Sequence, residues 1–292
     1  MKGEEHLWGV LNDKLEMLRA TNQTAEAIRI GQSALEIAKR SFGAADTRLA
    51  QSYEKLGALH EQKGDRPAAK AYLLNAHRIL ARLQPTDSQA LFYSSRRLGQ
   101  LCSELGQTEE AIDFYEQAVA AAPQVPQLPY SDLGALLNNV ALICRKAGRA
   151  VTAEPYYLRA LQIYEDQLGS EHPDVASVLN NLGVFYTNQK RFTEAEQIHL
   201  RALAIREKAF PSNHPDIAQS KCNLAVVYHS RGEYDRASEL YRASLQTWEN
   251  AMAKPPEEYE VVAANYADLL RSLGKARKAH ALESRVRKKR HG

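Results

Sequence analysis

An alanine recurs at a fixed spacing of 42 residues along this chain of 292 residues. The seven alanines are Ala27, Ala69, Ala111, Ala153, Ala195, Ala237 and Ala279. Five residues before each of them stands a residue typical of a turn: Asn22, Gly64, Gly106, Gly148, Lys190, Gly232 and Gly274. A constant period of this size is typical of a repeat array, in which each unit buries its apolar face against its neighbours. The register therefore predicts an extended binding surface rather than a catalytic cleft.

One repeat, over residues 172–210, shows what each unit contains. Its first half carries Leu179, Leu182, Gly183 and Tyr186 at i, i+3, i+4 and i+7, which is one stripe of an α-helix. A turn follows, and a second helix is expected to begin at Thr193. This threonine either forms a capping box with Glu196 or stands in the first turn. The small residues Gly183 and Ala195 allow the two helices to approach closely.

The pattern predicts an all-α, right-handed superhelical solenoid with no strand. About seven helix–turn–helix repeats are expected in a single array over 1–292, at approximately 5–43, 46–84, 87–123, 130–169, 172–210, 214–253 and 257–290. The segment 123–130 contains three prolines and should shorten the second helix of the third repeat.

Composition points to a reducing compartment. No run approaches the roughly 18 apolar residues that span a bilayer, and the first residues lack the pattern of a signal peptide. We therefore expect a cytoplasmic protein, with cytoskeletal or membrane association left open. Cys102 and Cys144 occupy equivalent slots one repeat apart, too far for a disulfide, so free buried thiols are expected.

The residues of the 172–210 repeat resemble the tetratricopeptide pattern. Leu179, Leu182-Gly183 and Tyr186 match its first helix, and Ala195 and Ala202 match its second helix. The usual period of this family is 34 residues, so the longer period here implies longer helices and a linker between repeats. The resemblance covers almost the whole chain in its period.

Three repeats, over 130–168, 172–210 and 214–252, are specifically similar to those of kinesin light chains. The phrases HPDVASVLNNLGVFY, FTEAEQIHLRALAIREKAF and HPDIAQSKCNLAVVYHSRGEYDRASELYRASL carry this similarity. Kinesin light chains have an N-terminal coiled coil that binds the heavy chain, whereas the first repeat here begins near residue 5. The chain therefore resembles a bacterial kinesin-light-chain-like protein more than a motor subunit. The resemblance implies a tubulin-like filament as a partner.

Asparagines line the expected concave side of the array. Four consecutive repeats place one at an equivalent position: Asn139, Asn181, Asn223 and Asn265, with Asn138 and Asn180 directly before two of them. An amide ladder can hydrogen-bond the backbone of a peptide whatever its sequence, and kinesin light chain repeats imply the same role. The alternative is that these amides bond to neighbouring helices within the solenoid.

Cations take the ladder position in earlier repeats. Lys55 and Arg97 stand there, and Arg145 and His229 lie on nearby faces. A groove with amides at one end and cations at the other would suit an acidic peptide, although a solvated charged face would show the same residues. The Lys/Asn set that co-chaperones use to clamp a terminal carboxylate is missing, because Glu54, Ala58 and Tyr93 fill the corresponding slots.

The C-terminal end, 285–292, is strongly basic. From residue 271 onward, nine lysines and arginines face one acid. The residues proposed for contact are Arg285, Arg287, Lys288, Lys289 and Arg290. They could bind anionic lipid or an acidic surface, or they could simply complement the dipole of the last helix. No interleaved aromatic residues support a nucleic-acid site.

Nothing in the sequence indicates an enzyme, a metal site or a cofactor. His172 and His214 each precede Pro-Asp in equivalent linkers, which indicates helix capping rather than metal binding. No phosphate loop or nucleophile elbow is present. We therefore expect a non-catalytic protein-interaction adaptor that links a tubulin-like filament to cargo or an anionic membrane. A general assembly or chaperone-type scaffold with a peptide ligand is the alternative, and a nucleic-acid-linked regulator is a further one.

Overall fold

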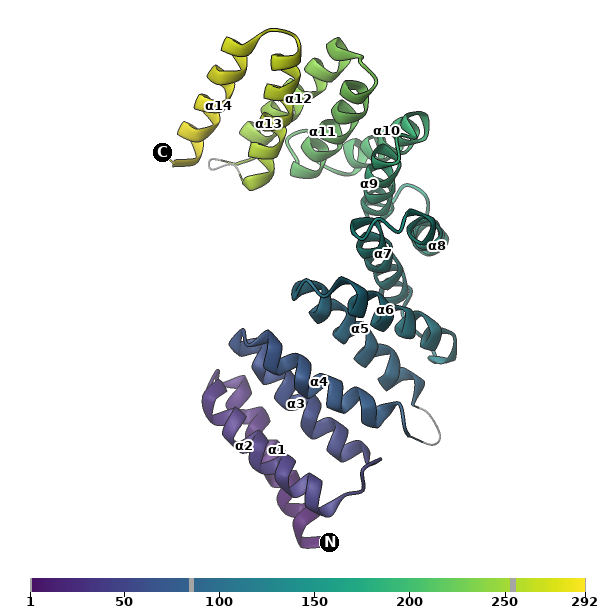
Figure 1. The fold of residues 1–292 in the computed structure, drawn as a ribbon, viewed down its shortest axis with the longest axis vertical. Helices are drawn as coiled ribbons and strands as arrows, with labels where there is room; N and C mark the ends of the chain where they lie inside the picture. The colour runs from purple at the N-terminus through teal and green to yellow at the C-terminus, as the bar shows by residue number, and fades with distance from the viewer. Residues whose placement is uncertain (1, 84–86, 253–255, 292) are drawn as a thin grey trace. The chain divides into compact units, whose positions relative to one another are not determined.

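The computed structural model describes residues 2–83, 87–252 and 256–291, and the side chains of all of these except Lys2, Arg290 and His291. Within these ranges the chain forms the helices α1 to α14 and one short 3-10 helix, with no strand (Figure 1). Successive helices pair as antiparallel hairpins, such as α3 with α4 and α11 with α12. The predicted all-α repeat fold is confirmed.

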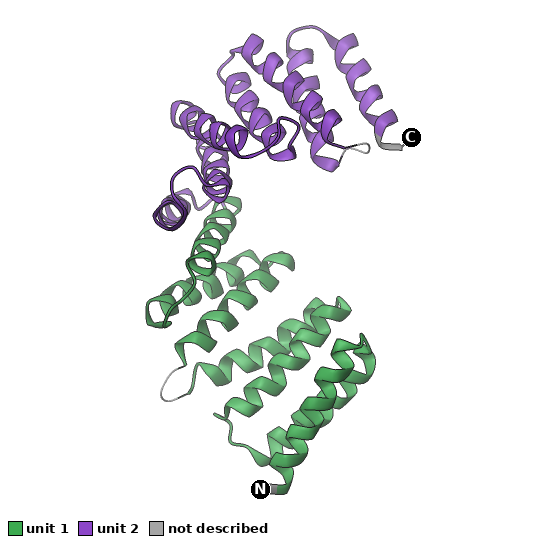
Figure 2. Ribbon diagram, turned by 180° about the vertical axis from the view of Figure 1, so that it is seen from behind, with its two compact units in different colours: residues 1–147 green, residues 148–292 purple. Residues whose placement is uncertain are grey.

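The chain divides into two compact units, residues 1–147 and residues 148–292 (Figure 2). Unit 1 contains α1 (Lys2–Ala20), α2 (Thr24–Ser41), α3 (Thr47–Lys63), α4 (Arg66–Leu80), α5 (Ser88–Glu104), α6 (Thr108–Ala121), the 3-10 helix (Ala122–Gln124) and α7 (Tyr130–Lys146). Unit 2 contains α8 (Ala150–Leu168), α9 (Pro173–Asn188), α10 (Phe192–Ala209), α11 (Pro215–Ser230), α12 (Tyr234–Ala251), α13 (Glu257–Ser272) and α14 (Ala276–His291). As predicted, the proline-rich segment leaves α6 short, and a 3-10 turn and a loop follow it.

The 42-residue register marks one physical position in every hairpin. All seven register alanines are fully buried, with 0% of their surface exposed. All seven turn residues have a positive φ, including the non-glycines Asn22 at 57° and Lys190 at 60°. Glycine adopts this conformation without strain, and asparagine tolerates it better than most residues. The register therefore fixes both the close helix contact and the turn that precedes it.

Close packing of the hairpins depends on a small residue facing a ring. A Cβ atom added to Gly99 would lie 2.6 Å from the ring of Tyr115, and one added to Gly183 would lie 2.6 Å from the ring of His199. Both rings are buried, so neither can turn aside into solvent. The glycine is therefore required by the ring that packs on it.

The capping prediction is confirmed at the His-Pro-Asp starts of α9 and α11 but not at the start of α10. The Nδ1 atoms of His172 and His214 accept hydrogen bonds from the backbone N–H of Asp174 and Asp216, both at 3.2 Å, so the His-Pro-Asp linkers cap α9 and α11 as expected. The second helix of the 172–210 repeat begins at Phe192, not at Thr193. Thr193 therefore stands in the first turn, and a capping box is not formed.

The three cysteines are free and buried, as predicted. Burial raises the pKa of the Cys102 and Cys222 thiols, because the charged thiolate is poorly solvated there.

None of the described helices combines the length and the apolar character that a membrane-spanning segment requires.

Candidate functional site

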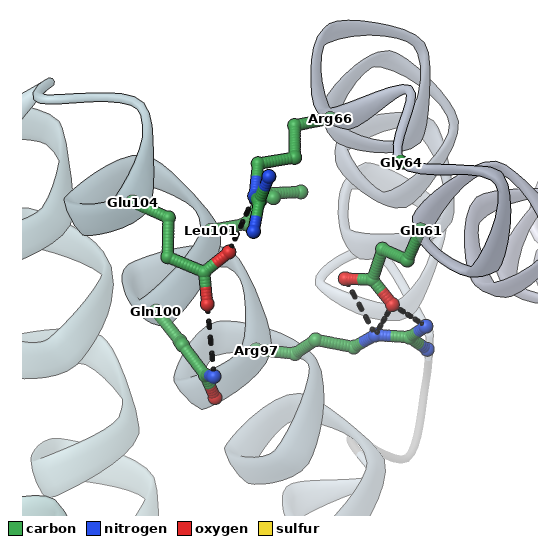
Figure 3. Close-up of a pocket in the computed structure, with 7 residues that line it drawn as sticks. All are labelled: Glu61, Gly64, Arg66, Arg97, Gln100, Leu101 and Glu104. Atoms are coloured by element: carbon green, nitrogen blue, oxygen red, sulfur yellow. Dashed lines mark hydrogen bonds and ion pairs between the residues drawn. The ribbon is translucent and has the colours of Figure 1, made fainter. Parts of the chain in front are cut away.

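Two adjoining cavities lie on the face that α3, α5 and α7 present in unit 1. The first has a volume of about 280 Å³ and is lined by Glu61, Gly64, Arg66, Arg97, Gln100, Leu101 and Glu104 (Figure 3). The second has a volume of about 250 Å³ and is lined by Gln100, Ser103, Glu104, Tyr115, Asn139, Leu142, Ile143 and Lys146. Because Gln100 and Glu104 line both cavities, we call the two together the unit 1 groove.

Two ion pairs form the walls of the first cavity (Figure 3). The Nε of Arg97 donates to the two carboxylate oxygens of Glu61 at 3.3 and 3.1 Å. The Nε of Arg66 donates to Glu104 at 2.7 Å, and this hydrogen bond lowers the pKa of the Glu104 carboxyl. Gln100 also donates to Glu104, at 3.1 Å. Each charge in this cavity is therefore matched before a ligand arrives.

The second cavity is lined by the buried ring of Tyr115 and by two exposed polar side chains, Asn139 and Lys146. Tyr115 is 4% exposed, and burial raises the pKa of its hydroxyl to about 12. Asn139 and Lys146 are exposed on α7, and neither has a hydrogen bond or ion pair within the described residues. One amide and one ammonium group are therefore available to a ligand at this end of the groove.

The other predicted cations are placed differently. Lys55 on α3 forms an ion pair with Glu16 on α1 at 3.2 Å, so two cations at the ladder position, Lys55 and Arg97, already bind an acid. Arg145 is half-buried on α7, and its Nε has no hydrogen-bond partner. In unit 2, His229 is half-buried beside the Tyr241 ring, and burial lowers its pKa.

Two asparagines of unit 2 contact a side chain on a neighbouring first helix. The Nδ2 of Asn223 on α11 donates to the Oδ1 of Asn180 on α9 at 2.7 Å. Asn265 on α13 approaches the Sγ of Cys222 at 4.0 Å. Asn138 and Asn181 also have interaction partners. Helix-to-helix bonding thus accounts for Asn180 and Asn223, and Asn139 lines the unit 1 groove.

The α14 residues predicted for contact are placed in two ways where their side chains are described. Lys289 and Arg285 lie 3.1 and 3.4 Å from the carboxylate of Glu249 on α12, which also accepts a hydrogen bond from Tyr259. Arg287 and Lys288 are exposed and have no ion pair in the described part of the chain. The side chain of Arg290 lies outside the described residues.

The sequence-based prediction missed several residues that line the groove, namely Glu61, Arg66, Gln100, Glu104 and Tyr115. A signal for two of them was present. Gln100 lies one helical turn beyond Arg97 and Glu104 lies two turns beyond it, on the same face of α5. Extending the stripe from Arg97 would have found both.

Comparisons with known proteins agree with this repeat architecture. Two profiles of the tetratricopeptide repeat family match the chain, one over residues 132–186 and 174–250 and the other over residues 97–125. Together these residues make up just over half of the chain. A search of curated protein sequences found no significant match.

Solved structures share the fold. BtubC (BKLC) from P. vanneervenii is 25% identical, with a TM-score of 0.61, and the match covers 83% of this chain and 95% of that chain. A tetratricopeptide repeat protein from Parabacteroides merdae is 19% identical, with a TM-score of 0.61, covering 86% of this chain and 82% of that one. YrrB, described as a tetratricopeptide repeat protein with an unusual peptide-binding site, is 17% identical, with a TM-score of 0.50, covering 73% and 90%. On the matches to the two family profiles, the chain is a member of the tetratricopeptide repeat family.

Proposed function

We propose that this protein is a non-catalytic adaptor that binds a segment of a partner protein in the unit 1 groove. The observation that carries the proposal is the pair of cavities that share Gln100 and Glu104. They form two neighbouring subsites beside Gln100 and Glu104, an arrangement that suits two side chains of one extended or helical segment. Predicted groove residues line both subsites, Arg97 in the first and Asn139 in the second.

The chemistry of the lining describes the segment that would fit. Asn139 offers an amide donor and acceptor, and Lys146 offers an uncompensated positive charge. A partner carboxylate near Lys146 gains a charge-assisted hydrogen bond without breaking an existing ion pair. In the first cavity, Glu61 and Arg97 are already paired. This cavity therefore favours a neutral polar side chain that can hydrogen-bond to the existing ion pairs. The fitting ligand is thus a polar peptide with an acidic residue at one end.

For the partner itself we propose a tubulin-like filament, which the adaptor would link to cargo or to an anionic membrane surface in the cytoplasm. The similarity of three repeats to kinesin light chains supports this, as does the likeness to BtubC. The exposed cations Arg287 and Lys288 would contact the acidic surface.

Cosedimentation with polymerised bacterial tubulin tests this proposal. The wild-type chain should pellet with the filaments at low salt and less so as the salt concentration rises, because charge contacts are screened. Gln100→Trp places an indole on a residue that lines both cavities and should abolish pelleting. Gln162→Trp on α8 is the matched control. Like Gln100, Gln162 is exposed and donates a hydrogen bond to an acidic residue four positions later, in this case Asp166. A wild-type chain that stays in the supernatant at low salt would exclude the filament as partner.

A further inference from the structure

Helix α1 has an exposed apolar stripe that the groove does not use. Leu7, Val10 and Met17 are 48, 48 and 60% exposed. Their spacing of three and seven residues places them on one face of the helix, beside the face that buries Leu15 and Leu18 in the core of unit 1. Isolated exposed apolar residues are ordinary, but three of them along one helix form a surface suited to another helix.

One acid and one base accompany this stripe, Asp13 and Lys14. Both are exposed, and neither has an ion pair within the described residues. The other acids of α1 are engaged within unit 1. Glu4 accepts a hydrogen bond from Ser41 at 2.8 Å, and Glu5 and Glu16 pair with Arg48 and Lys55. Among the described side chains of α1, the unmatched charges beside the stripe are therefore Asp13 and Lys14.

We propose that the occupant of this stripe is α1 of a second copy of the chain, packed antiparallel about a two-fold axis. Residues 7, 10, 14 and 17 follow the alternating three- and four-residue spacing of a helix–helix seam. In an antiparallel pair centred near residue 12, Leu7 lies opposite Met17 of the second copy. Val10 then lies opposite the aliphatic stem of Lys14 of the second copy.

The same arrangement pairs the charges. Asp13 lies one helical turn from Val10, so a lysine opposite Val10 can reach it. The two-fold axis creates this Asp13–Lys14 pair twice. A partner of uniform charge would leave either Asp13 or Lys14 facing a like charge, whereas a second copy neutralises both. A single helix pair buries less than the roughly 1,200 Å² of a standard interface, so the dimer should dissociate on dilution.

The test is sedimentation velocity of the full chain from about 5 to about 500 µM, a range that resolves a micromolar dimer. We expect a concentration-dependent monomer–dimer equilibrium in the wild type. Asp13→Lys and Lys14→Asp each place like charges together and should raise the dissociation constant at least about tenfold, which corresponds to about 1.4 kcal/mol. The double variant Asp13→Lys/Lys14→Asp restores opposite charges across the axis and should dimerise again.

Two further variants keep the test specific. Val10→Asp should leave the chain monomeric at every concentration, with an unchanged circular dichroism spectrum because Val10 is half exposed. Val261→Asp alters an apolar residue of similar exposure, 54%, on α13 and should dimerise like the wild type. A wild type that stays monomeric throughout would overturn the proposal. So would a double variant no better than the single variants, or loss of the dimer in Val261→Asp.

Discussion

The side-chain amide of Asn223 donates a hydrogen bond to the side-chain oxygen of Asn180 at 2.7 Å, and this bond links α11 to α9. Asn180 is 6% exposed, so its oxygen has little access to water if the bond is lost. In unit 1 the equivalent position holds Arg97, which pairs with Glu61 on α3. At these two ladder positions, Asn223 and Arg97, neighbouring first helices are joined by an amide pair in unit 2 and by an ion pair in unit 1.

Loss of this amide pair should destabilise unit 2. Asn223→Ala leaves the Asn180 oxygen buried and unpaired, which costs about 1–3 kcal/mol. Asn265→Ala is the matched control, since it removes only a 4.0 Å approach to a cysteine sulfur and should change stability by less than about 0.5 kcal/mol. Urea denaturation measures both. Equal midpoints for Asn223→Ala and the wild type would mean that the bond contributes nothing to the fold.

Two helical glycines should respond in opposite directions to alanine. Gly183→Ala places a methyl group 2.6 Å from the buried His199 ring and should destabilise the protein by about 1–3 kcal/mol. Gly9→Ala on α1 meets nothing within 4 Å and should stabilise it by about 0.5–1 kcal/mol, because alanine favours the helix. Thermal melts of the two variants give the comparison, and a stabilised Gly183→Ala would contradict the packing described.

The free energy of unfolding should decrease as the pH is lowered, because the buried His199 resists protonation in the folded protein. Burial, together with the nearby charge of Arg206, lowers the pKa of His199 from 6.5 to about 4. Above pH 6.5 the ring is neutral in both states. Between pH 6.5 and about 4 only the unfolded chain takes up the proton, so the free energy of unfolding drops, by about 3 kcal/mol in total.

Replacement of this histidine should remove that pH dependence. Tyr115, Tyr157 and Tyr241 occupy the equivalent slot in other repeats and are buried. His199→Tyr should therefore gain stability over the wild type as the pH falls from 6.5 to 4. Urea unfolding at several pH values measures the gap between the two proteins, which should be widest near pH 4. A constant gap across this range would show that His199 does not titrate as described.

The exposed cations of α14 should matter for anionic membranes. At about 1 kcal/mol per basic residue, Arg287→Ala/Lys288→Ala should weaken binding to phosphatidylserine vesicles roughly thirtyfold. The melting temperature should not change, because neither side chain has an ion pair in the described structure. Arg40→Ala/Lys63→Ala is the charge-matched control, on exposed residues of unit 1. Vesicle flotation compares the three proteins, and equal flotation would remove the membrane role of this end.

The sequence was sufficient to predict the repeat fold, because the register depends on local requirements. A buried alanine and a turn residue of positive φ recur at one spacing whatever the rest of the repeat contains. The His-Pro-Asp caps were predictable for the same reason. The start of α10 was not, since Arg191 at its N-cap makes no side-chain cap and gives no capping signal.

The pairing of charges in the groove could not be read from the register. Arg97 reaches Glu61 over 36 residues and Arg66 reaches Glu104 over 38 residues, whereas equivalent positions are 42 residues apart. Such pairs depend on side-chain length and rotamer and on the offset of neighbouring helices, not on position in the repeat. The sequence therefore predicted cations at the ladder position but not the acids that already bind them.

Binding to an immobilised library of short peptides tests most directly whether the unit 1 groove is the binding surface. The wild-type chain and Gln162→Trp should bind the same subset of peptides, enriched in polar sequences with an acidic residue. Gln100→Trp should lose at least about tenfold in affinity for that subset, because Gln100 lines both cavities and the larger indole obstructs them. An identical binding profile for Gln100→Trp and the wild type would show that the partner binds elsewhere.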